Sequence, residues 1–188
     1  MLKRHLSAAV AATVTAVFFF LPAANAAASS LAPHRAVYSM KMLGSAEGSD
    51  ISSVSGRLVI EWQGSSCDGF VTSQRIVNRM GSKQGSSFVS DFRVNSWESG
   101  DGNDFNFSMS HFMNGTSIEE IEGTAQRENS GGVATLSKPE KGAIKLPASI
   151  VFPTEQVKAL MASAMAGRKV HSAPVFDGSD TEHYFETT

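Results

Sequence analysis

The sequence predicts a mainly β, single-domain protein whose strands form a curled antiparallel meander with one short α-helix. Alternating apolar and polar residues recur through most of the chain, which is typical of strands with one buried face. Turns rich in glycine, asparagine and aspartate separate these runs, and only one segment has helical spacing. Strands joined by short turns favour an antiparallel sheet over a βαβ arrangement, whose parallel strands need long crossovers.

The first half of the chain is expected to contain four strands. They are residues 36–42, 54–62, 70–80 and 88–97. The second shows the alternation most clearly, because five alternate residues that are apolar, aromatic or glycine fall on one face. These residues are Val54, Gly56, Leu58, Ile60 and Trp62. Polar turns are expected at 44–53 and at Gly64 to Gly69, and the second turn carries Cys67.

Residues 105–109 and 118–126 are expected to form a hairpin around Asn114-Gly115. Both turn residues tolerate the positive φ of a two-residue primed turn, so this dipeptide is the strongest hairpin signal in the chain. Two shorter strands are expected at 133–136 and 143–146.

The single helix is expected over Thr154 to Ala166, with Thr154 as its cap and Gly167 as the glycine at its C-terminus. Its apolar residues recur with a helical period and are Val157, Leu160, Met161, Ala164 and Met165. Because this stripe is the helix's only apolar face, we expect it to pack against the inner face of the sheet. Further strands are expected at 170–176 and 183–188.

The N-terminus has the features of a cleavable secretory signal. Lys3 and Arg4 precede the uncharged run from Leu6 to Leu21, and Ala24-Asn25-Ala26 supplies the small residues that signal peptidase requires. Cleavage should leave Ala27 as the first residue. The apolar run is shorter than the roughly 20 residues that span a bilayer, so we expect no transmembrane anchor after cleavage.

Export would place the mature protein outside the cytoplasm, with the expected signal at 1–26 and one β-rich domain at 27–188. Without Lys3 and Arg4 the chain has 14 basic and 18 acidic residues, a net charge of −4. This balance does not favour nucleic acid as a partner. The sequence has no Gly-x-Ser-x-Gly elbow, Walker loop or Gly-x-Gly-x-x-Gly helix start, so we expect no catalytic site and no cofactor.

Candidate metal ligands are weak. The histidines expected to remain after cleavage are His34, His111, His171 and His183, and no two have the short spacing of a zinc site. A denser oxygen-rich group consists of Asp177, Asp180, Glu182 and His183. Its spacing does not fit an EF-hand loop, so a solvated turn is the favoured interpretation.

An ordered set of short blocks runs through nearly all of the mature chain. The blocks are Leu31-Ala32-Pro33-His34-Arg35-Ala36-Val37-Tyr38, Val54-Ser55-Gly56-Arg57-Leu58, Cys67-Asp68-Gly69, Asn114-Gly115 with Glu120 and Gly123, Lys138-Pro139-Glu140-Lys141, Leu146-Pro147, Phe152-Pro153-Thr154-Glu155 and Asp177-Gly178-Ser179. In this order they resemble the EipB family of cell-envelope integrity proteins.

The resemblance implies a periplasmic protein of an alphaproteobacterium-like cell, folded as a long antiparallel β-spiral with a short helix and without known catalytic residues. The shape is similar to that of the half-open lipoprotein carriers LolA and LolB, which hold acyl chains. Family members continue past the Asp177-Gly178-Ser179 turn with more strands and a second cysteine. The resemblance therefore implies a truncated member, in which Cys67 is one half of the disulfide of complete members and is left as an unpaired, exposed thiol.

The leading functional hypothesis is a noncatalytic periplasmic factor that maintains the envelope, through a hydrophobic ligand or an envelope protein as its partner. The alternative is a lipid or lipoprotein carrier of the LolA/LolB type. An envelope hydrolase comes third, because it needs a convergent acid, base and nucleophile that the sequence does not supply.

Overall fold

A computed structural model describes residues 31–188. The predicted signal and its cleavage site, Ala24, Ala26 and Ala27, lie outside the described residues. Within 31–188, no helix has both the length and the apolar character needed to span a bilayer.

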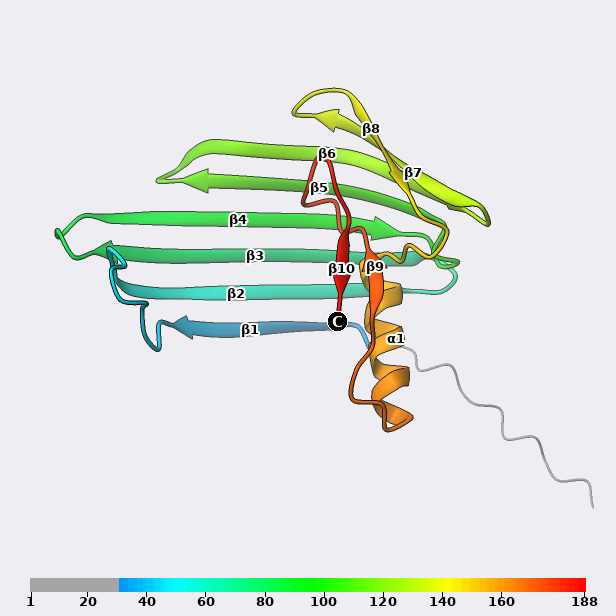
Figure 1. The fold of residues 1–188 in the computed structure, drawn as a ribbon, viewed down its shortest axis with the longest axis horizontal. Helices are drawn as coiled ribbons and strands as arrows, with labels where there is room; N and C mark the ends of the chain where they lie inside the picture. The colour runs from blue at the N-terminus through cyan, green and yellow to red at the C-terminus, as the bar shows by residue number, and fades with distance from the viewer. Residues whose placement is uncertain (1–30) are drawn as a thin grey trace, which may run out of the picture.

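Eight antiparallel strands form one open sheet in which every strand pairs with its neighbours in the sequence (Figure 1). They are β1 (His34–Lys41), β2 (Ile51–Ser65), β3 (Gly69–Ser82), β4 (Ser87–Glu98), β5 (Asp104–Met113), β6 (Thr116–Glu128), β7 (Gly131–Lys138) and β8 (Gly142–Leu146). The predicted meander is confirmed. Residues 51–53 were expected in a turn, but they form the beginning of β2. Backbone pairing to β3 does not depend on side-chain alternation, and it extends to Ile51.

The β5–β6 hairpin has the predicted turn. Asn114 has φ 51° and Gly115 has φ 84°, so both central residues adopt the left-handed conformation of a primed turn. The Asn114 side chain also accepts a hydrogen bond from the Val89 amide at 2.8 Å. This contact joins the hairpin turn to the beginning of β4.

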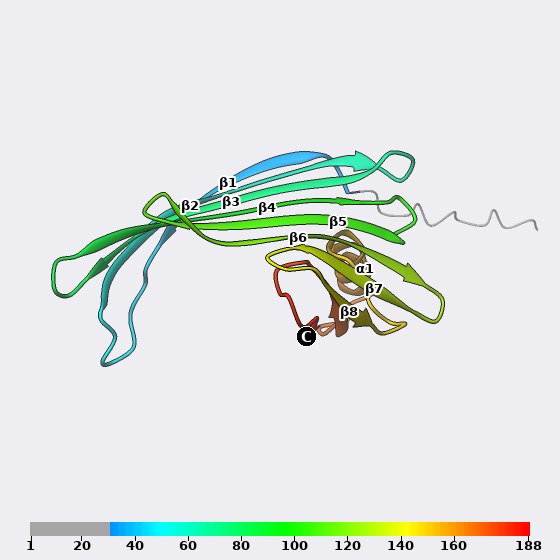
Figure 2. The same cartoon turned by 90° about the horizontal axis from the view of Figure 1, so that it is seen from above.

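The sheet curves along its strands, and β7 and β8 turn away from the plane of β1–β6 (Figure 2). We call the face toward which it curves the concave face and the opposite one the convex face. A compact core fills the curl formed by β5–β8. Its buried side chains are Phe105, Phe107, Met109, Ile121, Ala125, Ala134, Leu136, Ile144, Leu146, Ile150, Phe152 and Phe176.

The helix, α1 (Pro153–Met165), crosses the concave face at one end of the sheet (Figures 1 and 2). The expected cap was wrong: Phe152 occupies the N-cap without a side-chain hydrogen bond, and Thr154 lies inside the first turn. Gly167 does follow the helix, with φ 73°, and its amide donates to the Ala164 carbonyl at 2.9 Å.

The expected packing of the helix was also wrong. The side chains of Val157, Leu160, Met161 and Met165 are all exposed, by 36% to 78%. The buried residues of α1 are Thr154 and Ser163, which are polar. The helix is fixed instead by polar contacts at its first turn and by the core residue Phe152, so periodicity indicated the helix but not the face that packs.

Two short strands complete the described fold. β9 (Ala173–Val175) and β10 (Phe185–Thr187) pair with each other, and Val151 forms a parallel bridge to Val175. These strands are shorter than the predicted 170–176 and 183–188. The Asp177-Gly178-Ser179 turn packs on the core: Gly178 has φ 75°, and a Cβ there would clash with the Phe107 ring.

Candidate functional site

Charge is segregated between the two faces of β1–β4. The register places one apolar or aromatic row across five neighbouring strands on the concave face. This row is Tyr38, Leu58, Ile76, Phe92 and His111. The charged residues of β1–β4 occupy the alternate positions, with one exception, Glu98.

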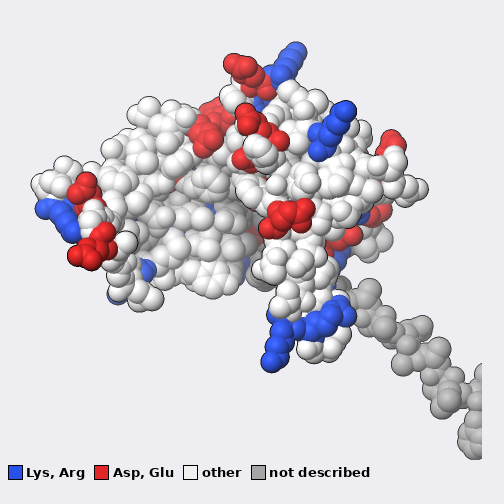
Figure 3. Space-filling view, viewed as in Figure 1, with Lys and Arg blue, Asp and Glu red and all other residues white. Residues whose placement is uncertain are grey.

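The concave face is hollowed and carries few charges at its surface. Figure 3 shows a recess between the tip of the sheet and the α1 end, covered almost entirely by side chains other than Lys, Arg, Asp and Glu. No element of residues 31–188 lies over the part of β1–β4 between the tip of the sheet and α1 in Figures 1 and 2. Strands with an apolar face normally bury it, so an uncovered apolar face is a candidate binding surface.

Aromatic and polar contacts border the recess. Trp62 and Phe70 are buried and stack with their ring centroids 5.1 Å apart. The Lys158 ammonium lies 3.8 Å from the centroid of the Phe70 ring, a cation–π contact that places α1 over this part of the sheet. Farther along, the Phe92 and His111 rings meet edge to face at 5.8 Å, and His111 Nε2 lies 2.8 Å from Ser90 Oγ.

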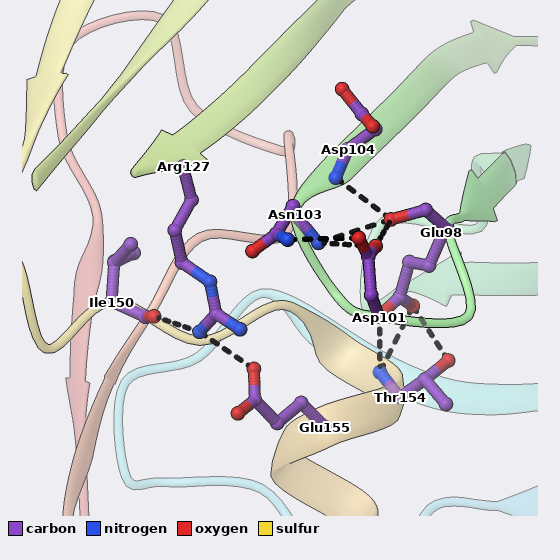
Figure 4. A network of polar contacts seen from close by, with 9 residues as sticks. Glu98, Asp101, Asn103, Asp104, Arg127, Ile150, Thr154 and Glu155 are labelled. Carbon is purple, nitrogen blue, oxygen red and sulfur yellow. Dashed lines mark hydrogen bonds and ion pairs between the residues drawn. The ribbon is translucent and has the colours of Figure 1, made fainter. Parts of the chain in front are cut away.

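Glu98 anchors the start of α1 to the sheet (Figure 4). Its side chain is only 2% exposed and accepts hydrogen bonds from the Thr154 amide at 2.9 Å and from Thr154 Oγ1 at 2.7 Å. The amide is one of the orphan donors of a helix start, so a carboxylate from β4 serves as the cap that Phe152 lacks. Burial raises the pKa of Glu98, while the two bonds from Thr154 oppose that rise.

Arg127 of β6 holds the other side of this helix start. Its Nη1 donates to the Ile150 carbonyl at 2.8 Å and forms an ion pair with Glu155 Oε2 at 2.7 Å (Figure 4). The guanidinium also lies 5.9 Å from the Phe152 ring centroid. Glu98 and Arg127 thus fix α1 from two strands, and this polar cluster positions the helix at the border of the recess.

The sequence-predicted site residues do not converge. Cys67 is a free thiol in the β2–β3 turn and is exposed, as predicted for its side chain. In the oxygen-rich group, Asp177 accepts from Ser179, and Asp180 accepts from the Glu182 and His183 amides at 2.7 and 2.8 Å. These carboxylates stabilise turns. The hydrogen bond from the Glu182 backbone amide is the main cause of the lowered pKa of Asp180.

Sequence reasoning missed Glu98. The signal was present in the alternation itself, because Phe92, Val94 and Glu98 occupy positions of the same parity and must face the same side of β4. A carboxylate on the apolar side of a strand needs a partner, since an unpaired buried charge is costly. The partner, Thr154, lies 56 residues away, which only the fold reveals.

Comparisons with known proteins agree with this architecture. The sequence profile described as EipB-like matches residues 25–188. The chain belongs to the EipB-like family. It is 34% identical over 190 residues to the cell envelope integrity protein EipB of Brucella abortus (strain 2308), a match that covers 98% of this chain and 68% of that protein.

A solved structure has the same fold as this EipB-like chain. It is the crystal structure of a β-barrel-like protein of a domain of unknown function, DUF1849, from Brucella abortus. The two share 35% sequence identity and a TM-score of 0.76, over 80% of this chain and 62% of that one. The EipB-like chain thus spans about two thirds of the length of these relatives.

Proposed function

We propose that this EipB-like chain is an exported, noncatalytic periplasmic protein that supports cell-envelope integrity by holding an apolar group on the concave face of its sheet. The Brucella relative is named as a cell envelope integrity protein, which supports the general role. The observation that carries the binding role is the row of Tyr38, Leu58, Ile76, Phe92 and His111, in which Tyr38 is exposed and the other four are half-buried, Phe92 partly by the core. An acyl chain is the ligand class that fits this row, because the row offers dispersion contacts and little charge.

Two adjacent residues of β1 provide a matched test. Tyr38 and Val37 have similar exposure, 52% and 56%, but alternation points Tyr38 to the concave face and Val37 to the convex face. Tyr38→Lys places a charge on the apolar face, whereas Val37→Lys adds the same charge on the other side. Both positions are too exposed for either change to unfold the protein.

The measurement is rescue of a strain that lacks its own copy of the gene, scored as survival in detergent. Wild type and Val37→Lys should restore survival, and Tyr38→Lys should not, with equal protein amounts by immunoblot. Edman sequencing of the protein from the periplasmic fraction should begin at Ala27. Equal rescue by both variants would contradict a role for the concave face, and an intact Met1 in the membrane fraction would contradict export.

A further inference from the structure

The convex face of β1–β4 is strongly cationic, although the whole chain is slightly acidic. It carries six basic residues and two acidic ones: Arg35, Lys41, Arg57, Arg75, Arg79 and Arg93 against Glu61 and Asp91. This face therefore differs in charge both from the concave face and from the protein as a whole.

Both acidic residues of the convex face already have cationic partners. Asp91 accepts two hydrogen bonds from Arg75, at 2.9 and 2.7 Å, and it also pairs with Arg93 at 2.7 Å. Arg35 lies 3.9 Å from Glu61. These contacts account for three of the six basic side chains.

The other three cations have no acidic partner among residues 31–188. They are Lys41, Arg57 and Arg79. Lys41 and Arg79 both stand opposite Ser55, and Arg57 is two residues farther along the same strand. Arg57 is thus a diagonal neighbour of both other cations, at the roughly 7–8 Å that separates such positions.

These three cations line one groove of about 820 Å³, together with Arg75, whose guanidinium is already paired with Asp91. The hydroxyl-bearing residues Ser39 and Ser55 lie between them, Val59 and Val77 are also part of the wall, and no acidic residue lines the groove. Like charges this close on one face repel each other, and a bound anion would offset that repulsion.

We propose that this convex groove binds a phosphate-bearing ligand larger than a free ion. Arginine forks and serine hydroxyls supply several donors to one phosphate, and three cations match a group with two or more negative charges. The valine side chains leave room for an apolar or neutral remainder of the ligand. The groove lies on the face opposite the recess, so a test of ligand binding in the groove is independent of a test of the proposed function.

Arg57 is the residue to change, because it neighbours both other cations. Arg57→Gln removes the central charge, and Arg57→Lys keeps the charge but removes the fork. Arg35→Gln is the matched control: it removes one charge from the same face, but outside the groove lining. Without ligand and at low salt, Arg57→Gln should melt no lower than wild type, because it relieves repulsion.

Binding is measured in two arms at constant ionic strength. In the first, pyrophosphate is titrated into the protein while the amide resonances of residues 39–41, 55–57 and 77–79 are followed. In the second, the protein is sedimented with phosphatidylcholine vesicles that contain phosphatidic acid or lack it. In the responding arm, Arg57→Gln should weaken binding about tenfold, the loss of one charge-assisted contact, and Arg35→Gln by no more than about twofold.

A response to pyrophosphate would support a soluble phosphate-bearing ligand, and a response to phosphatidic acid vesicles alone would identify a lipid headgroup. The proposal is overturned if neither arm responds, or if Arg35→Gln and Arg57→Gln weaken binding equally. In the second case the attraction would belong to the face as a whole and not to the groove.

Discussion

Replacing Glu98 by glutamine should destabilise the fold by about 2 kcal/mol at neutral pH. The change keeps the shape of the side chain but removes its charge and exchanges one acceptor oxygen for a donor. Glu98 is 2% exposed and accepts from both the amide and the hydroxyl of Thr154. The substitution therefore changes contacts that the solvent cannot replace.

The magnitude follows from the acceptor that the substitution removes. Glu98 faces Thr154 with two acceptor oxygens, and glutamine puts an amide donor in place of one of them, opposite the donating Thr154 amide. A buried donor without a partner costs about 1–3 kcal/mol, which gives about 2 kcal/mol here. Loss of the negative charge does not add to this cost, because burial outweighs the hydrogen bonds from Thr154 and raises the Glu98 pKa.

The same substitution has a defined pH dependence. The native pKa of Glu98 lies above its ordinary value of 4.5, so between these two values the native state binds a proton that the unfolded state releases. This linkage makes wild type gain stability from Glu98 as the pH falls from neutral toward 4.5, whereas the glutamine variant has no such gain. The stability gap between them should therefore widen on acidification.

Urea unfolding, followed by tryptophan fluorescence and far-UV circular dichroism at pH 7 and pH 5, measures this gap. Glu128→Gln, an exposed carboxylate on β6, is the matched control and should change the unfolding free energy by less than about 0.5 kcal/mol. A Glu98→Gln protein as stable as wild type, or a gap that narrows on acidification, would refute the capping role and the buried environment of Glu98.

Three further predictions concern the core, the helix and the turn. Phe105→Ala should lower the unfolding free energy by about 3–5 kcal/mol in the same urea assay, because Phe105 is fully buried and stacks on Phe152 at 4.9 Å. Val71→Ala, at an exposed position, should change it by no more than about 0.5 kcal/mol. Leu160→Asp should cost less than about 1 kcal/mol, and a loss of several kcal/mol would show that the apolar stripe of α1 is packed after all. Cys67 should react with a maleimide in the native protein and form a reducible dimer in air, both absent in Cys67→Ser; a thiol that labels only after unfolding would contradict its exposure.

Most of the sheet could be predicted from the sequence because strand alternation and turn chemistry are local. The Asn114-Gly115 turn needs only the two left-handed residues that occupy it. The packing of α1 could not be predicted in this way, because it depends on which neighbours surround each side of the helix. The Leu160 side is left uncovered by residues 31–188, while Thr154 is buried by a carboxylate from β4.

The recess was predictable only in part. The apolar face containing Leu58 and Ile60 follows from alternation alone. That Tyr38, Ile76 and Phe92 extend this face across neighbouring strands depends on register. The apolar face is left uncovered by the described chain because of where α1 and β7–β8 turn. Long-range contacts, such as those of Arg127 and Glu98, set these turns.

Native mass spectrometry of protein purified from the periplasm without detergent tests the concave-face proposal most directly. Wild type and Val37→Lys should carry a bound species with the mass of an acyl-chain lipid, which is released by organic solvent, and Tyr38→Lys should carry little or none. A spectrum of ligand-free wild-type protein, or equal occupancy in Val37→Lys and Tyr38→Lys, would contradict the binding of an apolar ligand on the concave face.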